Sequence, residues 1–138
     1  MRFANRQSIK TICSALIVVT MSCPARSADE VKSKQLLKER VAVLNEVATL
    51  ASRLYGQGSV PLLELNKAKQ AVCKAELDLC ETDVERIAVM DTRLALAKQD
   101  VEVVKRLVSM AEMSTTDLLK AQAKQLKIEA ALERRKGN

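Results

Sequence analysis

The stretch that decides the fold runs from Leu54 to Ala75 and reads LYGQGSVPLLELNKAKQAVCKA. Gly56 and Gly58 can adopt positive φ without steric cost, which is what a helix C-terminus requires. Ser59 is a residue type that caps the free N–H groups of a following helix, and Pro61 is tolerated in a first helical turn. The stretch therefore predicts a helix, a tight turn and a second helix.

The composition extends this prediction to the whole chain. Its 138 residues are the size of one domain, and they include only three Gly, two Pro, one Phe and one Tyr. So few turn residues exclude a many-stranded sandwich or barrel, and a chain rich in Ala, Leu, Lys and Glu is typical of long helices. The expected fold class is all-α, built from long antiparallel coiled-coil helices.

Rows of apolar residues predict four helices. The first spans about Val31–Tyr55 and the second Val60 to about Cys80. The third begins after Thr82, and the fourth runs from the Ser109–Thr116 turn to about Arg135. The first helix carries two adjacent rows, which predicts that it packs against more than one neighbour. One row is Leu37, Val41, Leu44, Ala48, Ala51 and Tyr55, and the other is Leu36, Val43, Val47, Leu50 and Leu54. Thr82 with Glu85 predicts a capping box, and Ser114, Thr115 or Thr116 is the expected cap of the last helix.

The chain also repeats itself. Glu39 to Leu44 aligns with Glu85 to Met90 at an offset of 46, whereas Leu65 and Ala68 align with Leu118 and Ala121 at an offset of 53. The two offsets differ by one heptad, which preserves the buried face of a helix. We expect a duplicated helical hairpin with both turns at one end, repeat one at about 31–82 and repeat two at about 83–136. The arrangement is a four-helix up-down-up-down bundle or an extended hairpin pair.

Residues 1–27 have the layout of a signal peptide, and residues 28–138 then form the helical-hairpin domain. A basic start is followed by a short apolar run from Thr11 to Met21 and by small residues. Cleavage after Ser27 is expected, with Ala25 or Ala28 as alternatives. A second option is lipidation at Cys23, because Thr20 to Cys23 loosely resembles a lipobox. The chain is expected to be exported to the periplasm or the outer membrane, with no transmembrane segment in its mature part.

The net charge of +6 comes mostly from the leader. Its four basic residues are unopposed by any acid, and the rest of the chain has 19 basic and 17 acidic residues. The remaining charges alternate in sign, with no basic stripe and no aromatic stacking platform, so nucleic-acid binding is rejected.

The turn sequences carry a resemblance to a known family. Tyr55-x-x-Gly58 is followed by Leu62-Leu63-Glu64-Leu65-Asn66-Lys67-Ala68, and the second copy has Ala111 in place of the glycine, followed by Thr115-Thr116-Asp117-Leu118-Leu119-Lys120-Ala121-Gln122. This pattern over residues 37–135 resembles the outer-membrane efflux protein (TolC-like) family, although Asn66 departs from its usual Leu. The resemblance implies duplicated periplasmic hairpins whose tips meet an adaptor protein, and a role in transport.

Membrane-spanning strands between the hairpins, which that family's channels need, have no counterpart in this sequence. The chain is therefore expected to be either a small exported relative that keeps only the hairpins or a fragment of a longer protein.

Partner binding is expected at the two hairpin tips. Two roles are open for Tyr55. It is either an anchor for a partner or a plug at the end of the helices with its hydroxyl in water. Met110 and Met113 at the second turn are either end-packing residues or part of a contact surface. The candidate partner-binding residues are Tyr55, Gly58, Ser59, Pro61, Met110 and Met113.

Cys73 and Cys80 are seven residues apart on one expected helix, about 10 Å along its axis. That separation is too long for a disulfide between them. They are either buried apolar residues or partners in an intermolecular disulfide. A metal site is not expected, because the chain has no His and two thiolates at this spacing cannot share a tetrahedral ion.

No catalytic residue and no cofactor are expected. The sequence contains no phosphate-binding loop, no Ser/His or Cys/His pair and no paired carboxylates suited to acid–base chemistry. The first hypothesis is a non-enzymatic exported coiled-coil protein that associates through its helices with itself or with an envelope partner. The alternative is a small periplasmic helical chaperone or stress-response binding protein.

Overall fold

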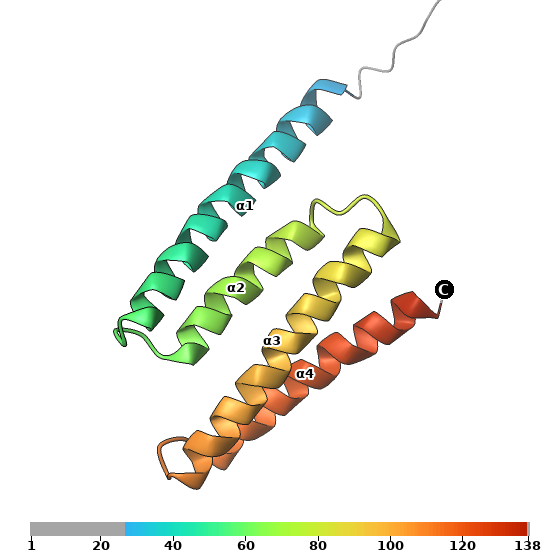
Figure 1. Cartoon of the computed structure of the whole chain (residues 1–138). Helices are drawn as coiled ribbons and strands as arrows, with labels where there is room; N and C mark the ends of the chain where they lie inside the picture. Colours follow the sequence, from blue (N-terminus) through green and yellow to red (C-terminus); the bar gives the residue numbers. More distant parts are fainter. Residues whose placement is uncertain (1–26, 138) are drawn as a thin grey trace, which may run out of the picture.

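Four α-helices account for nearly all of residues 27–137, which are the residues that the computed structural model describes (Figure 1). They are α1 (Ser27–Gly56), α2 (Leu62–Leu77), α3 (Asp83–Ser109) and α4 (Thr115–Lys136). The all-α prediction is confirmed. The predicted second helix was too long, because α2 ends at Leu77 rather than near Cys80.

The helices form an open row in chain order. α1 packs on α2, α2 on α3 and α3 on α4, and within residues 27–137 the backbones of no other pair of helices come into contact. Of the two expected arrangements, this is the extended hairpin pair. Figure 1 shows both hairpin turns at the same end of the molecule, opposite the connection from α2 to α3.

The first turn, tip 1 (Tyr55–Pro61), ends α1 with a Schellman motif. The Ser59 N–H donates to the Leu54 carbonyl at 2.8 Å, and the Gly58 N–H donates to the Tyr55 carbonyl at 2.9 Å. Gly58 has a φ of 71°, and it is the only glycine of the described residues with a positive φ. The prediction that Gly56 would also use this freedom was wrong, because Gly56 is still part of α1.

The second turn, tip 2 (Ser109–Thr116), has the same geometry 53 residues later. The Glu112 N–H donates to the Leu107 carbonyl at 2.9 Å, and the Ala111 N–H donates to the Val108 carbonyl at 3.0 Å. Ala111 takes a φ of 58° at the position that glycine holds in tip 1. Equivalent positions of the two hairpin turns are therefore 53 residues apart in the structure.

Two of the three predicted caps are present. The Glu85 N–H donates to Thr82 Oγ1 at 3.2 Å and the Glu85 carboxylate accepts from the Thr82 N–H, which completes a capping box at α3. Ser114 and Asp117 form the same reciprocal pair at α4. The cap predicted for Ser59 was wrong, because α2 begins at Leu62 and Pro61, which has no side chain able to cap, holds the N-cap position.

The largest buried cluster lies between α3 and α4. It consists of Met90, Leu94, Ala97, Ile128 and Leu132, with Leu77, Ile87 and Ala131 packed against it. The three members from α3 are spaced four and three residues apart in the sequence, so a three–four repeat becomes the seam of hairpin two. None of the helices in residues 27–137 combines the length and apolarity that crossing a membrane requires.

Candidate interaction surfaces

The tip residues that the sequence singled out lie together at one end of the row of helices (Figure 1). In tip 1 the Tyr55 side chain is 43% exposed, and Gly58, Ser59 and Pro61 are exposed. In tip 2 Met110 is 51% exposed and caps the C-terminus of α3, whereas Met113 is half-buried. The structure thus places an aromatic and a methionine on the surface at the same end, in two different turns.

A continuous apolar stripe lies on the outside of α1. We call Leu36, Val43, Val47 and Leu50 the α1 stripe, and each of these side chains is about half exposed or more. The neighbouring row contains the half-buried Val41 and Leu44 and the buried Ala48, and α2 is the helix on which α1 packs. For residues 27–137 the prediction that this helix packs against more than one neighbour was wrong, because α2 is the only described helix that contacts α1.

A second apolar stripe lies on the other edge helix. We call Leu119, Ala123, Leu126 and Ala130 the α4 stripe; all four are exposed, with Leu119 and Leu126 at 60% and 61%. Their spacing of four, three and four residues puts them on one face of α4. Monomeric proteins rarely leave long rows of large apolar side chains open to water, so stripes on both edge helices indicate interaction surfaces.

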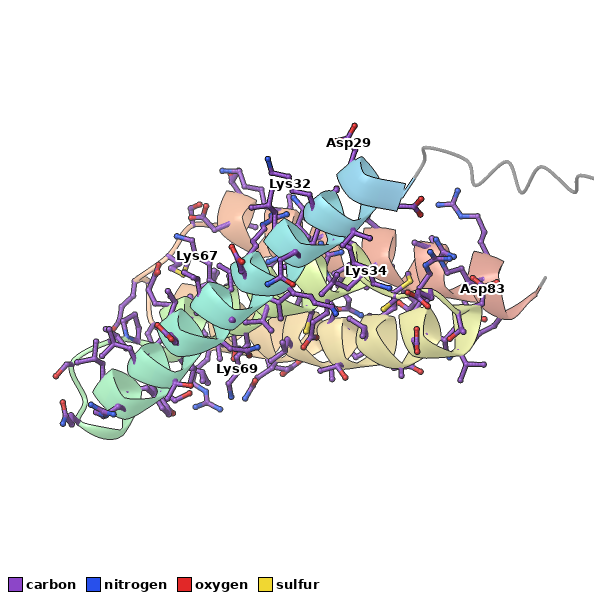
Figure 2. The ribbon with its side chains drawn as sticks, turned by 90° about the horizontal axis from the view of Figure 1, so that it is seen from above. Asp29, Lys32, Lys34, Lys67, Lys69 and Asp83 are labelled. Carbon is purple, nitrogen blue, oxygen red and sulfur yellow. The ribbon has the colours of Figure 1, made fainter. Side chains whose placement is uncertain are left out.

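Two grooves of more than 400 Å³ lie beside α1. The first, of about 420 Å³, runs beside the α1 stripe and is lined mainly by Val47, Leu50, Ala51, Leu54, Val60, Ala68 and Ala71, with Glu64 and Lys67 at its edge. The second, of about 490 Å³, lies between α1, α2 and α3 and includes Lys69, Cys73 and Leu96. In Figure 2 Lys67 and Lys69 lie on opposite sides of the α1 ribbon; Lys67 lines the first groove and Lys69 the second.

The two thiols of the described residues are free. Cys73 is buried and Cys80 is half-buried, with its thiol 3.2 Å from the Glu76 carbonyl oxygen that it donates to. Burial raises the pKa of both thiols, and the nearby carboxylates of Glu76 and Glu85 add to this effect. Both cysteines are therefore poorly ionised near neutral pH, and Cys73 is enclosed by the contact between the hairpins.

A buried polar cluster joins the two hairpins, and sequence reasoning missed it. The Asp100 carboxylate on α3 accepts hydrogen bonds from Asn66 Nδ2 at 2.9 Å and Gln70 Nε2 at 2.6 Å, both on α2. Lys124 Nζ on α4 lies 3.6 Å from the same carboxylate. The available signal was that Asn66 stands where the resembling family has Leu, and that Gln70 follows it at helical spacing.

Several ion pairs fasten the end opposite the tips. Arg135 bonds Asp83 at 3.1 Å and Lys136 bonds Asp91 at 3.3 Å, which ties the end of α4 to the start of α3. Lys34 of α1 pairs with Glu81 in the connection from α2 to α3, and this hydrogen bond raises the pKa of Lys34. These contacts are exposed, so they orient the helices more than they stabilise them.

Within residues 27–137, no three His, Cys, Asp or Glu side chains converge as metal ligands would. The predicted signal peptide at residues 1–27 lies, apart from Ser27, outside the described residues, and the predicted lipidation site at Cys23 lies outside them as well. What the described geometry offers is therefore surface for helix packing: two apolar stripes, one apolar groove and two tips. Comparison of the chain with protein-family models, with curated proteins and with solved structures finds no match.

Proposed function

We propose that this chain is an exported, non-enzymatic assembly protein that acts by helix–helix association with itself or with a partner in the cell envelope. The observation that carries the proposal is the pair of apolar stripes on the two edge helices, α1 and α4. Each stripe has the spacing of a coiled-coil seam, and no other helix of residues 27–137 packs against it. Covering them would remove exposed apolar surface from water, which is the main driving force of association.

The tips support a second contact in the same assembly. Tyr55 and Met110 are exposed in adjacent turns at one end of the row, and aromatic and Met side chains are common anchors at protein interfaces. In the TolC-like family that the turn sequences resemble, the hairpin tips meet an adaptor protein. We assign the tips to an end-on partner and the stripes to side-by-side packing.

Site-specific photocrosslinking in bacterial cells tests the proposal. The full chain is expressed with a photoreactive amino acid at Leu50, in the α1 stripe, or at Ala42, which is exposed on α1 outside the stripe. We expect covalent adducts from position 50 and few from position 42. Adducts of twice the mass of the chain identify self-association, and others identify a partner. Equal labelling at the two positions, or none at either, would argue against association through the stripe.

Export has its own readout. If residues 1–27 are a signal peptide, the intact mass of the purified chain corresponds to a start at Ala28. If Cys23 is lipidated instead, the chain starts at Cys23 and its mass includes the lipid. A chain that keeps Met1 and stays inside the cell contradicts the export part of the proposal.

One observation favours the chaperone alternative, namely the apolar groove of about 420 Å³ beside the α1 stripe. A groove of this kind can take the apolar face of an unfolded or helical client segment. A holdase assay separates the two functions. Suppression of client aggregation that is lost in Leu50→Glu but kept in Ala42→Glu favours the chaperone, and absence of suppression favours assembly.

A further inference from the structure

The offset of 53 residues that relates the two turns also relates the packing within the two hairpins. On α1 the residues of the covered row are Val41, Ala48 and Ala51, and 53 positions later α3 has Leu94, Val101 and Val104, all of them buried. The two hairpins are therefore structural copies, and each face of one has an equivalent on the other.

The contact between the hairpins uses a different face of each helix. On α2 this face contains Asn66 and Gln70, which bond to Asp100 of α3, followed by Cys73. On α3 it contains Asp100 and Leu96, and Leu96 borders the same groove as Cys73. This α2–α3 contact is the only place where hairpin one and hairpin two pack helix against helix within the described chain.

The equivalents of these interface residues are the two exposed stripes. Adding 53 to Asn66, Gln70 and Cys73 gives Leu119, Ala123 and Leu126, which are the α4 stripe. Subtracting 53 from Leu96 and Asp100 gives Val43 and Val47, and Val103, the next residue along that face of α3 by helical spacing, corresponds to Leu50; all three belong to the α1 stripe. α4 thus presents the face that α2 uses, without an α3 to receive it, and α1 presents the face that α3 uses, without an α2.

We propose that the occupant of each stripe is a second copy of this chain, with α4 of one copy packed antiparallel on α1 of the next, as α2 packs on α3. This inference rests on the proposed function and names its partner and its geometry. Because the two surfaces differ, the contact is heterologous, and repetition gives either a closed ring or an open filament. Every hairpin in such an assembly has its tip at the same end.

The polar cluster of Asn66, Gln70 and Asp100 explains why the α2–α3 contact within a chain and the α4–α1 contact between chains do not exchange helices. If α4 of another copy took the place of α2 on this face of α3, Leu119 and Ala123 would face Asp100 and leave a buried carboxylate without its amide donors. If α2 of another copy packed on the α1 stripe, Asn66 and Gln70 would face Val47 and lose their acceptor. Polar residues therefore specify the contact within the chain, and apolar residues are left for the contact between chains.

A mixing experiment tests this pairing. Leu50→Glu puts a charge in the α1 stripe and Leu126→Glu puts one in the α4 stripe, and each is purified as the full chain in reductant so that cysteines do not contribute. Both positions are at least half exposed, so the variants should keep their helical circular dichroism and melting temperature. Ala42→Glu and Lys127→Glu change charge on exposed positions outside the stripes and serve as matched controls.

Light scattering after gel filtration gives the readout. We expect the wild-type chain and both controls to form species of at least twice the monomer mass, and each stripe variant to be a monomer. An equimolar mixture of the two stripe variants should form a dimer and nothing larger, because each contributes one intact stripe.

Three outcomes would overturn the inference: a wild-type chain that stays monomeric, a Leu126→Glu chain that still dimerises through paired α1 stripes, or a mixture that yields no dimer. In any of these cases, crosslinks from position 50 to a different protein would leave the proposed function standing. Glutamine in place of glutamate at both positions repeats the test if a charged variant fails to fold.

Discussion

Gly58 and Ala111 hold the same left-handed backbone conformation at the same place in two hairpin turns, with φ of 71° and 58°. Each donates its N–H to the carbonyl three residues back, and the residue after each donates to the carbonyl five residues back. Glycine adopts this conformation freely, whereas an alanine pays a steric cost because of its Cβ atom. The duplicated turn therefore has one relaxed copy and one strained copy.

Replacing the strained residue should stabilise the protein. We expect Ala111→Gly to raise the free energy of unfolding by up to about 1 kcal/mol, because relief of the left-handed strain exceeds the entropy that glycine adds to the unfolded chain. Urea unfolding measures the change. Ala95→Gly, at an exposed position inside α3, is the control and should lower stability by a similar amount. If both substitutions destabilise equally, the strain at Ala111 is not real.

The reverse change in tip 1 should destabilise. A Cβ atom at Gly58 would meet nothing within 4 Å, so only its positive φ opposes a side chain there. We expect Gly58→Ala to cost about 1 kcal/mol and Gly58→Val more, because β-branched residues tolerate this conformation least. Gly56→Ala is the matched control, since Gly56 is helical and equally open, and it should be neutral or stabilising. Thermal unfolding separates the two sites, and a lower melting temperature for Gly56→Ala than for Gly58→Ala would contradict the assignment.

Much of this architecture follows from local sequence signals. The capping box at Thr82 and Glu85, the glycine at Gly58 and the apolar row containing Leu94 each specify their element through contacts with residues a few positions away. Such signals are readable because helix ends and helix faces depend on near neighbours in the chain. The wrong prediction at Ser59 is also local in origin, because α2 begins at Leu62, three residues after Ser59, and Pro61 holds the N-cap position.

What local signals do not reveal is which face meets which helix. The two apolar rows of α1 look alike in sequence, yet only the row with Val41 is covered, because α3 packs on α2 rather than on α1. The polar cluster was missed for a related reason: Asn66 and Asp100 are 34 residues apart and acquire meaning only as a pair. Choices between equivalent partners depend on long-range contacts, which periodicity does not encode.

The two capping boxes should make stability depend on acid. Hydrogen bonds from the backbone N–H groups of Thr82 and Glu81 lower the pKa of Glu85 below its ordinary 4.5. Bonds from Ser114 lower the pKa of Asp117 below its ordinary 3.8. Because both pKa values are lower in the folded state, the stabilisation is complete above the unfolded values and is lost as the pH falls through the folded ones.

The measurement is the melting temperature as a function of pH. It should fall below about pH 4.5 in the wild-type chain, and it should fall less steeply in Glu85→Gln and Asp117→Asn, which no longer titrate there. At neutral pH the variants should melt slightly lower than the wild type, because an amide is a weaker cap than a carboxylate. Parallel curves for all three proteins would show that the caps do not contribute to the acid transition.

The two thiols should react at different rates. Cys80 is half-buried and Cys73 is buried, and the pKa of each is raised by burial. We expect iodoacetamide to modify Cys80 slowly and Cys73 only after unfolding, with rates that still increase as the pH approaches 9. Mass spectrometry of tryptic peptides follows both sites. Rapid modification of Cys73 in the folded protein would mean that the contact between the hairpins opens.

The same contact gives the most demanding test of the polar cluster. Asp100→Val removes the acceptor of Asn66 and Gln70 and leaves two buried amides unpaired, so we expect a loss of about 2–4 kcal/mol in the free energy of unfolding. Adding Asn66→Leu and Gln70→Ala converts this contact to the residues that occupy the equivalent positions Val47, Leu119 and Ala123. An apolar contact of matched shape should then recover most of the lost stability.

The triple variant should also lose its specificity for pairing. Its α2–α3 contact would be chemically the same as the contact proposed between chains, so α4 of one copy could displace α2 from α3 of another. We therefore expect a stable helical protein with a broader distribution of masses in light scattering than the wild type. A triple variant with wild-type stability and an unchanged mass distribution would show that the cluster does not select partners. One that stays as unstable as Asp100→Val would show that the shapes of the two contacts are not equivalent.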